Sequence, residues 1–235
     1  MFAESYISTA SRIFAEYSLQ QPLSIYLKLF FKANPRFGSR DRKFIAELLY
    51  GIYRLGREAE HLTVRERLLS GSFLSGVLPL LFFEKTEQSL ARRYHLSFVE
   101  KKMYLSERFN LQMKVPFALS ANVSEDEYIA YLFQSSRVFI RIRSQVNKII
   151  AALQSKGVSF EVINDQCISL PANTKIQELL PQVQQYVIQD FASQLSGQFF
   201  NPVAGEYWWD CCAASGGKSL LLLEKNVPVH LTVSD

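Results

Sequence analysis

The sequence predicts a multidomain protein of mixed α and α/β class: a helical part, a small α/β part, and the start of a doubly wound α/β domain. Three observations predict it. Apolar residues recur at helical spacing in the first half, the spacing drops to two at Arg137, and a strand–loop–helix–strand pattern closes the chain. We therefore expect domains at residues 1–115, 116–186 and 187–235.

Composition indicates a globular intracellular protein. The chain has 235 residues, of which 48% are hydrophobic and 20% charged, unlike a disordered chain. The net charge of +4 permits nucleic-acid binding without requiring it. Three cysteines are too few for a disulfide framework, which favours a reducing cytoplasm. The most apolar stretch, Phe73–Phe83, is shorter than the roughly 20 residues that span a bilayer, so we expect no membrane association.

The first part reads as helices only. The clearest helix runs from Asp41 to Leu55, with Ser39 as its expected N-cap. Its apolar face is formed by Phe44, Ile45, Leu48, Leu49, Ile52 and Tyr53. The pairs Thr63–Glu66 and Ser124–Glu127 have the spacing of capping boxes, so we expect a helix to begin after each.

The middle part alternates like a strand from residue 137. Apolar residues at 138, 140 and 142 point to one side, and the other side carries Arg137, Phe139, Arg141 and Arg143. A helix between Asn147, its expected N-cap, and Gly157 follows, and then two short strands, at residues 158–163 and 167–170. This order predicts a small α/β module.

That strand face is a candidate RNA-binding surface. Guanidinium groups contact phosphates, and an aromatic ring on a sheet offers a stacking platform for unpaired bases. We therefore expect Arg137, Phe139, Arg141 and Arg143 to contact RNA. The alternative is a solvated face on which a neighbouring helix covers Phe139.

The last part predicts a β-loop-α-β unit. A helix capped by Asp190 precedes a strand at 207–212, a loop of small residues, a helix at 219–225 and a strand at 227–233. One such unit cannot bury both faces of its strands. We therefore expect the domain to continue beyond residue 235.

The loop between strand and helix is the candidate ligand site. Small residues and two glycines let the backbone approach a ligand closely, and Asp235, 19 residues after Gly216, falls where such folds bind ribose hydroxyls. A nucleoside ligand fits this pattern. A P-loop requires a glycine where Cys212 stands, and a dinucleotide fingerprint requires one where Lys218 stands. A glycine turn without a ligand remains the third alternative.

Two adjacent motifs carry a resemblance to a known family. The segment Asp210–Ser219, DCCAASGGKS, resembles the D-x-C-A-A-P-G-G-K-T motif of the Sun/Nop family of RNA cytosine-C5 methyltransferases, with Ser215 at the place of the proline. Upstream, VIQDFASQL at 187–195 is similar to that family's V-Q-D-x-A-S-Q-L segment. Residues 38–54 are similar to a segment of its NusB-like helical domain, and residues 139–143 to the strand that opens its RRM-like domain.

The resemblance implies the fold, cofactor and partner. It implies a NusB-like helical domain, an RRM-like α/β domain and a Rossmann-like methyltransferase domain of which 187–235 is the start. The implied cofactor is S-adenosylmethionine, bound by Asp235 at its ribose and by a loop that consists of Cys212, Ala213, Ala214, Ser215, Gly216, Gly217 and Lys218. The implied partner is RNA, either rRNA or tRNA, and we expect a monomer without a metal.

The resemblance also places the chemistry elsewhere. In that family a cysteine thiolate attacks C6 of cytosine, C5 takes the methyl group, and a second cysteine assists release. Both lie downstream of the cofactor loop, so we expect no catalytic residue within 1–235 and a buried, inert Cys167. The alternative is a non-catalytic RNA-binding protein that is derived from the same family.

Overall fold

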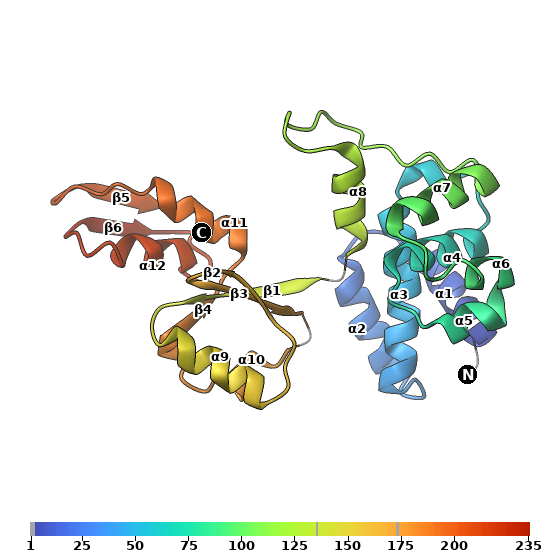
Figure 1. Ribbon diagram of the computed structural model, residues 1–235, viewed down its shortest axis with the longest axis horizontal. Coiled ribbons are helices and arrows are strands. Elements are labelled where there is room, and N and C mark those ends of the chain that lie inside the picture. Colours follow the sequence, from blue (N-terminus) through green and yellow to red (C-terminus); the bar gives the residue numbers. More distant parts are fainter. Residues whose placement is uncertain (1–2, 135, 173) are drawn as a thin grey trace. The chain divides into compact units, whose positions relative to one another are not determined.

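The structure is a computed structural model that describes residues 3–134, 136–172 and 174–235, apart from the side chain of residue 183. The chain forms two compact units, Met1–Gln134 and Ser135–Asp235 (Figure 1). The first is helical and the second contains all strands of the described residues. The protein is therefore of mixed α and α/β class. No helix in these ranges is both long and apolar enough to cross a bilayer.

The first unit consists of helices, most of them joined by short turns, with a longer irregular segment at 110–124 before the last helix. Their bounds are α1 Ala3–Glu16, α2 Leu23–Ala33, α3 Ser39–Leu55, α4 Val64–Ser75, α5 Leu80–Thr86, α6 Gln88–Ala91, α7 Phe98–Phe109 and α8 Glu125–Phe133, with a 3₁₀ turn at Arg57–Ala59. The helix predicted from Asp41 to Leu55 is confirmed as α3. Its face of Ile45, Leu48, Leu49 and Ile52 is fully buried.

Helices α3 and α4 approach each other closely at two glycines. A methyl group at Gly51 would lie 2.8 Å from the backbone of Gly71, and one at Gly71 would lie 2.3 Å from the backbone of Gly51. Any larger residue at either place would therefore push the two helices apart. This contact fixes α4 against the buried face of α3.

Helix starts in this unit use carboxylates as well as hydroxyls. Ser39 is not the N-cap of α3: Gly38 holds that place, and its amide donates a hydrogen bond to Asp41 Oδ2 at 2.9 Å. Both predicted capping boxes are confirmed, at Thr63 before α4 and at Ser124 before α8. The same arrangement occurs at Ser97 before α7.

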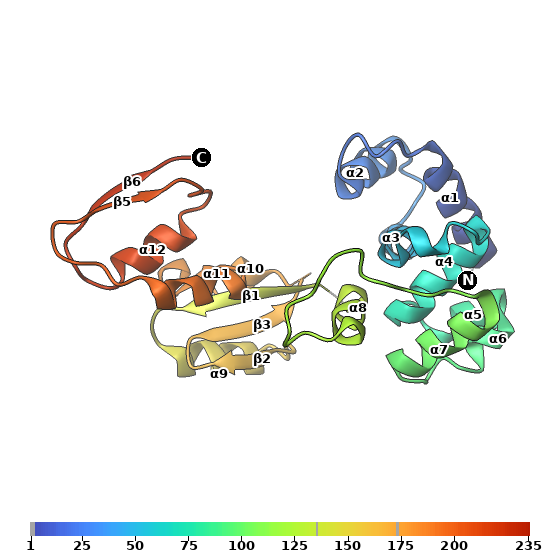
Figure 2. The same ribbon diagram turned by 90° about the horizontal axis from the view of Figure 1, so that it is seen from above.

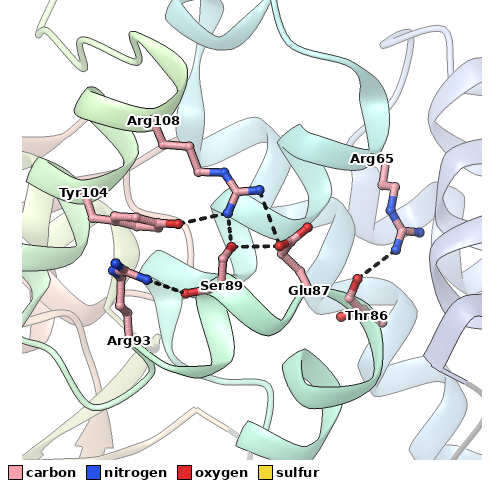
Figure 3. A network of polar contacts seen from close by, with 7 residues as sticks. All are labelled: Arg65, Thr86, Glu87, Ser89, Arg93, Tyr104 and Arg108. Carbon is pink, nitrogen blue, oxygen red and sulfur yellow. Dashed lines mark hydrogen bonds and ion pairs between the residues drawn. The ribbon is translucent and has the colours of Figure 1, made fainter.

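A polar network ties α7 to the junction of α5 and α6 (Figure 3). Ser89 donates to Glu87 Oε1 at 2.7 Å, and the Arg108 guanidinium reaches the same oxygen at 3.3 Å. Arg108 also donates to the hydroxyls of Tyr104, at 2.9 Å, and Ser89. Arg65 of α4 donates to the carbonyl oxygen of Thr86 at 3.0 Å. Helices α6 and α7 thus share one connected set of polar contacts through Glu87, and the separate Arg65–Thr86 bond joins α4 to the end of α5.

The second unit contains a four-stranded antiparallel sheet and a parallel pair of strands. The sheet has the order β2-β3-β1-β4 and the pair is β5-β6. Their bounds are β1 Arg137–Ile142, β2 Glu161–Asn164, β3 Cys167–Pro171, β4 Tyr186–Ile188, β5 Tyr207–Asp210 and β6 His230–Val233. The helices are α9 Val146–Ser155, α10 Ile176–Leu179, α11 Phe191–Ser196 and α12 Gly217–Leu223, with 3₁₀ turns at Val183–Gln185 and Gly197–Phe199.

The predicted strand–helix–strand–strand module is confirmed as β1-α9-β2-β3, and β4 adds a fourth strand beside β1. The expected N-cap of α9 is wrong. Asn147 lies inside the helix, and Gln145 precedes it in a left-handed conformation at φ 59°. The helix therefore begins two residues earlier than its side-chain chemistry indicates.

The two faces of the antiparallel sheet differ. One face buries Ile140, Ile142 and Ile168 against Ile149 and Leu153 of α9. Figure 1 shows α9 and α11 on opposite sides of this sheet, and Figure 2 shows its strands from the side of α11. The second face, which carries Phe139 and Arg141, is therefore turned toward α11 and α12.

Candidate functional site

The predicted β-loop-α-β unit is confirmed as β5, a loop, α12 and β6. The two strands are parallel, with Asp210 beside Val233 at the ends where both strands stop. The loop that follows β5 and the residue Asp235 that follows β6 therefore lie at the same edge of the strand pair. This arrangement brings the loop and the expected acidic residue together.

The loop turns through two left-handed residues. Gly216 has φ 79° and Ala214 has φ 44°, and the amide of Gly216 donates to the carbonyl oxygen of Ala213 at 2.7 Å. A side chain at φ near 79° strains the backbone, so Gly216 is a conformational requirement of this turn. α12 begins at the next residue.

Asp210 closes the loop from the strand side. Its Oδ2 accepts a hydrogen bond from the Ser219 hydroxyl at 2.6 Å, and its Oδ1 accepts one from the amide of Cys212 at 3.3 Å. The carboxylate therefore joins the end of β5 to the first turn of α12. Because both ends are tied, the loop between them has little freedom to change shape.

Asp235 contacts the loop directly. Its Oδ1 accepts a hydrogen bond from the amide of Ala214 at 2.7 Å. The amide of Ala213 donates to the carbonyl oxygen of Ser234 at 3.1 Å, which holds the two segments side by side. The contact between an acid after β6 and the loop after β5 is the geometry that the spacing predicts.

A cavity of about 270 Å³ adjoins the loop. Its lining is mostly apolar and consists of Phe200, Trp208, Trp209, Asp210, Cys211, Cys212, Lys218, Ser219, Leu222 and Leu231. Two of the expected cofactor residues, Cys212 and Lys218, line it. Ala214 and Ser215 are instead exposed on the surface of the loop, as is Asp235. The loop thus borders an apolar cavity through Cys212 and Lys218, whereas Ala214, Ser215 and the neighbouring Asp235 are exposed to solvent.

The candidate RNA-binding residues are placed differently from the expectation of an open basic face. Arg141 is buried, with only 5% of its side chain exposed, and it pairs with Glu224 of the α12 C-cap. Phe139 stacks on Phe191 of α11 at 6.0 Å between ring centres. This corrects the picture of four side chains projecting together into solvent, because α11 and α12 cover the middle of the face.

The two outer arginines remain partly accessible. Arg143 keeps 37% of its side chain exposed and donates to Glu224 Oε1 at 2.6 Å. Arg137 keeps 38% exposed, pairs with Glu161 at 3.5 Å and donates to Ser169. RNA contact by these two side chains stays a prediction.

Cys167 is fully buried in β3, as expected. Burial raises the pKa of its thiol. The thiolate is the nucleophilic form, so this environment disfavours reactivity. Cys211 and Cys212 are exposed at the loop.

Sequence reasoning missed the partners of Arg141. Its Nε donates to Gln189 Oε1 at 2.9 Å, and Glu224 lies 83 residues away along the chain. No local pattern predicts a pair of this separation. Gln189 was visible only as part of the motif at 187–195.

Comparison with known proteins finds a distant structural likeness. No family model matches the chain, and no curated protein matches it. A solved structure entitled "Crystal Structure of PH0851" is similar, with 14% sequence identity and a TM-score of 0.43. The similarity covers 97% of this chain and 62% of that one, so the chain spans less than two thirds of its length. A likeness of this degree defines neither a family nor an activity.

Proposed function

We propose that the loop Cys212–Lys218 and Asp235 bind S-adenosylmethionine, and that the chain belongs to an RNA cytosine-C5 methyltransferase. The observation that carries this proposal is the hydrogen bond between the Asp235 carboxylate and the amide of Ala214. It puts an acceptor for ribose hydroxyls beside a loop whose backbone a nucleoside can approach. The motif resemblance at 187–195 and 210–219 supplies the choice of cofactor and reaction.

Charge supports a sulfonium cofactor over a nucleoside triphosphate. Two carboxylates, of Asp210 and Asp235, hold loop amides that a phosphate-binding loop would offer to its ligand. These carboxylates would repel the negative charges of a polyphosphate placed beside them, so the loop disfavours such a ligand. The positive sulfonium of S-adenosylmethionine has no such conflict. Of the nucleoside ligands considered, the methyl donor therefore fits best.

RNA is the proposed partner. In this proposal the helical unit corresponds to a NusB-like domain and the antiparallel sheet to an RRM-like domain, each in contact with rRNA or tRNA. Of the four residues on this strand face, Arg137 and Arg143 keep more than a third of the side chain exposed, and we assign the phosphate contacts to these two.

The chain by itself should transfer no methyl group. The buried thiol of Cys167 is disfavoured as a nucleophile, the exposed Cys212 belongs to the proposed cofactor loop, and the exposed Cys211 before it has no assigned role. We therefore expect cofactor binding without 5-methylcytosine formation from residues 1–235. Detectable 5-methylcytosine in RNA incubated with this chain would overturn the assignment of the three cysteines.

Calorimetry with two ligands tests the proposed function. We expect S-adenosylmethionine to bind and ATP to bind far more weakly or not at all. Lys218→Ala should keep most of the affinity for S-adenosylmethionine, whereas a P-loop lysine is essential for triphosphate binding. Tight ATP binding that Lys218→Ala abolishes, with no response to S-adenosylmethionine, would contradict the proposal.

A further inference from the structure

Arg141 lies at the centre of a buried polar cluster between the antiparallel sheet and α12. Its Nε donates to Gln189 Oε1 at 2.9 Å, and its Nη1 pairs with Glu224 Oε2. Arg143 donates to the other oxygen of Glu224 at 2.6 Å. One strand thus places two guanidinium groups on a single carboxylate that follows α12.

The cluster contacts α12 at both of its ends. Glu224 is the C-cap of the helix, and Gln189 meets its first residue: a methyl group at Gly217 would lie 3.2 Å from Gln189 Nε2. Gln189 itself is anchored to the sheet, because its amide donates to the carbonyl oxygen of Phe139 at 3.1 Å. The helix that follows the candidate cofactor loop is therefore clamped at start and end by groups that converge on Arg141.

We propose that Arg141 is a positioning residue for the cofactor loop: it orients Gln189 against Gly217 and holds Glu224, and so fixes the angle at which α12 begins. The inference rests on the proposed function for its effect on the cofactor. Its effect on the loop does not depend on that function.

Because burying the cluster costs desolvation free energy, we infer that its contribution is to the geometry of α12 and not to the free energy of unfolding. Burying an arginine is expensive even when it is paired, and well-packed apolar residues serve stability at least as well. Within the described residues, Arg141 Nη2 and Gln189 Nε2 are buried without a hydrogen-bond partner. What the cluster provides instead is a rigid planar fork that reaches two partners on different elements in a fixed geometry, whereas a lysine ammonium is a compact point charge without that geometry.

Amide hydrogen exchange tests the effect on the loop without any ligand. In Arg141→Lys, and separately in Glu224→Gln, we expect faster exchange at Leu220–Glu224, since the amides of Leu220 and Glu224 donate to the carbonyl oxygens of Gly216 and Leu220 and so report on the first and last turns of α12, while amides of β1 and β3 keep their protection. Arg137→Lys is the control, because Arg137 is on the same strand but contacts Ser169 and Glu161. Unchanged exchange in both variants, or an equal loss of protection throughout the sheet, would overturn the inference.

A double-mutant cycle tests the contact that carries the effect to the loop. Gly217→Ala should weaken S-adenosylmethionine binding about fivefold, the value of one net hydrogen bond, because the methyl group displaces Gln189. If Gln189 transmits the effect, Gln189→Ala with Gly217→Ala should bind no more weakly than Gln189→Ala alone. Additive losses would overturn the inference. If the wild-type chain does not bind S-adenosylmethionine, the proposed function is wrong. The exchange experiment then still decides whether Arg141 positions the loop.

Discussion

The Asp210 carboxylate accepts a hydrogen bond from the Ser219 hydroxyl at 2.6 Å across the base of the loop. Asp210 ends β5, and Ser219 lies in the first turn of α12, where it is buried. The pair therefore closes the small-residue loop into a fixed turn. The contact thus fixes the two ends of the loop, and with them the place of the loop amides.

Loss of this contact should loosen the loop. We expect Ser219→Ala to lower the free energy of unfolding by about 1–2 kcal/mol, because the hydroxyl donates to a carboxylate in a partly buried place. Cofactor affinity should fall as well. Ser144→Ala is the matched control, since Ser144 is an exposed serine of the same unit outside the loop. Denaturant unfolding and calorimetry measure the two effects, and equal behaviour of both variants would show that the contact is unimportant.

Valine substitutions at two glycines can distinguish the effect of backbone strain on stability from the effect of a blocked ligand approach on cofactor binding. Gly216 and Gly205 both have left-handed backbone, at φ 79° and 83°, with open space around the place of a side chain. Valine at either position should cost roughly 1–2 kcal/mol or more of stability. Only Gly216→Val should also abolish cofactor binding, because it puts a branched side chain on the loop. Equal cofactor affinity in the two variants would exclude close approach of the ligand at Gly216.

The helical unit should lose a definite share of its stability in acid. Burial works against ionisation of Glu87, but the hydrogen bond from Ser89 and the charge of Arg108 outweigh it and lower the pKa of this carboxyl. The stabilisation is therefore complete above the ordinary glutamate pKa of about 4.3 and is lost as pH falls through the lowered value.

Glu87→Gln should accordingly flatten the fall in stability between about pH 5 and pH 2. Unfolding midpoints across this range measure the effect. Glu84→Gln, an exposed carboxylate of α5, is the control and should keep the wild-type slope. A Glu87→Gln profile parallel to the wild type would mean that the network of Figure 3 contributes no pH-dependent stability.

Salt dependence tests the accessible arginines. If Arg137 and Arg143 contact phosphates, each alanine variant should reduce the slope of log affinity for single-stranded RNA against log salt by about 0.7. Lys175→Ala is the control, because Lys175 is an exposed cation of the same unit that pairs with Glu178. Slopes unchanged in both arginine variants would leave these side chains with only the intramolecular partners described above.

Much of the architecture could be predicted because it is encoded locally. Helical spacing gave α3, alternation gave β1, and a run of small residues between two apolar strands predicted the loop before α12. The place of Asp235 beside the loop was also predictable, because parallel strands end at one edge and the spacing puts the acid there, but its bond to the amide of Ala214 was not.

The errors have two physical origins, one in long-range contacts and one in local backbone conformation. Alternation shows that Phe139 and Arg141 share a face, but not what covers that face. The cover comes from Phe191 and Glu224, which are distant in sequence and reach the sheet only after the chain has folded. The second origin is local: Asn147 has the right chemistry for an N-cap, but the left-handed Gln145 starts α9 earlier. Local patterns predict elements, and long-range contacts decide which of their faces are free.

Titration of S-adenosylmethionine into the wild-type chain and into Asp235→Ala tests the central claim most directly. The wild type should bind one equivalent, and Asp235→Ala should bind at least about tenfold more weakly, since a carboxylate that accepts ribose hydroxyls makes charge-assisted hydrogen bonds of about 1.5–3 kcal/mol. Asp165→Ala, at an exposed turn between β2 and β3, should leave the affinity unchanged. A wild-type chain without measurable binding, or equal affinity in Asp235→Ala, would contradict the assignment of this loop as a cofactor site.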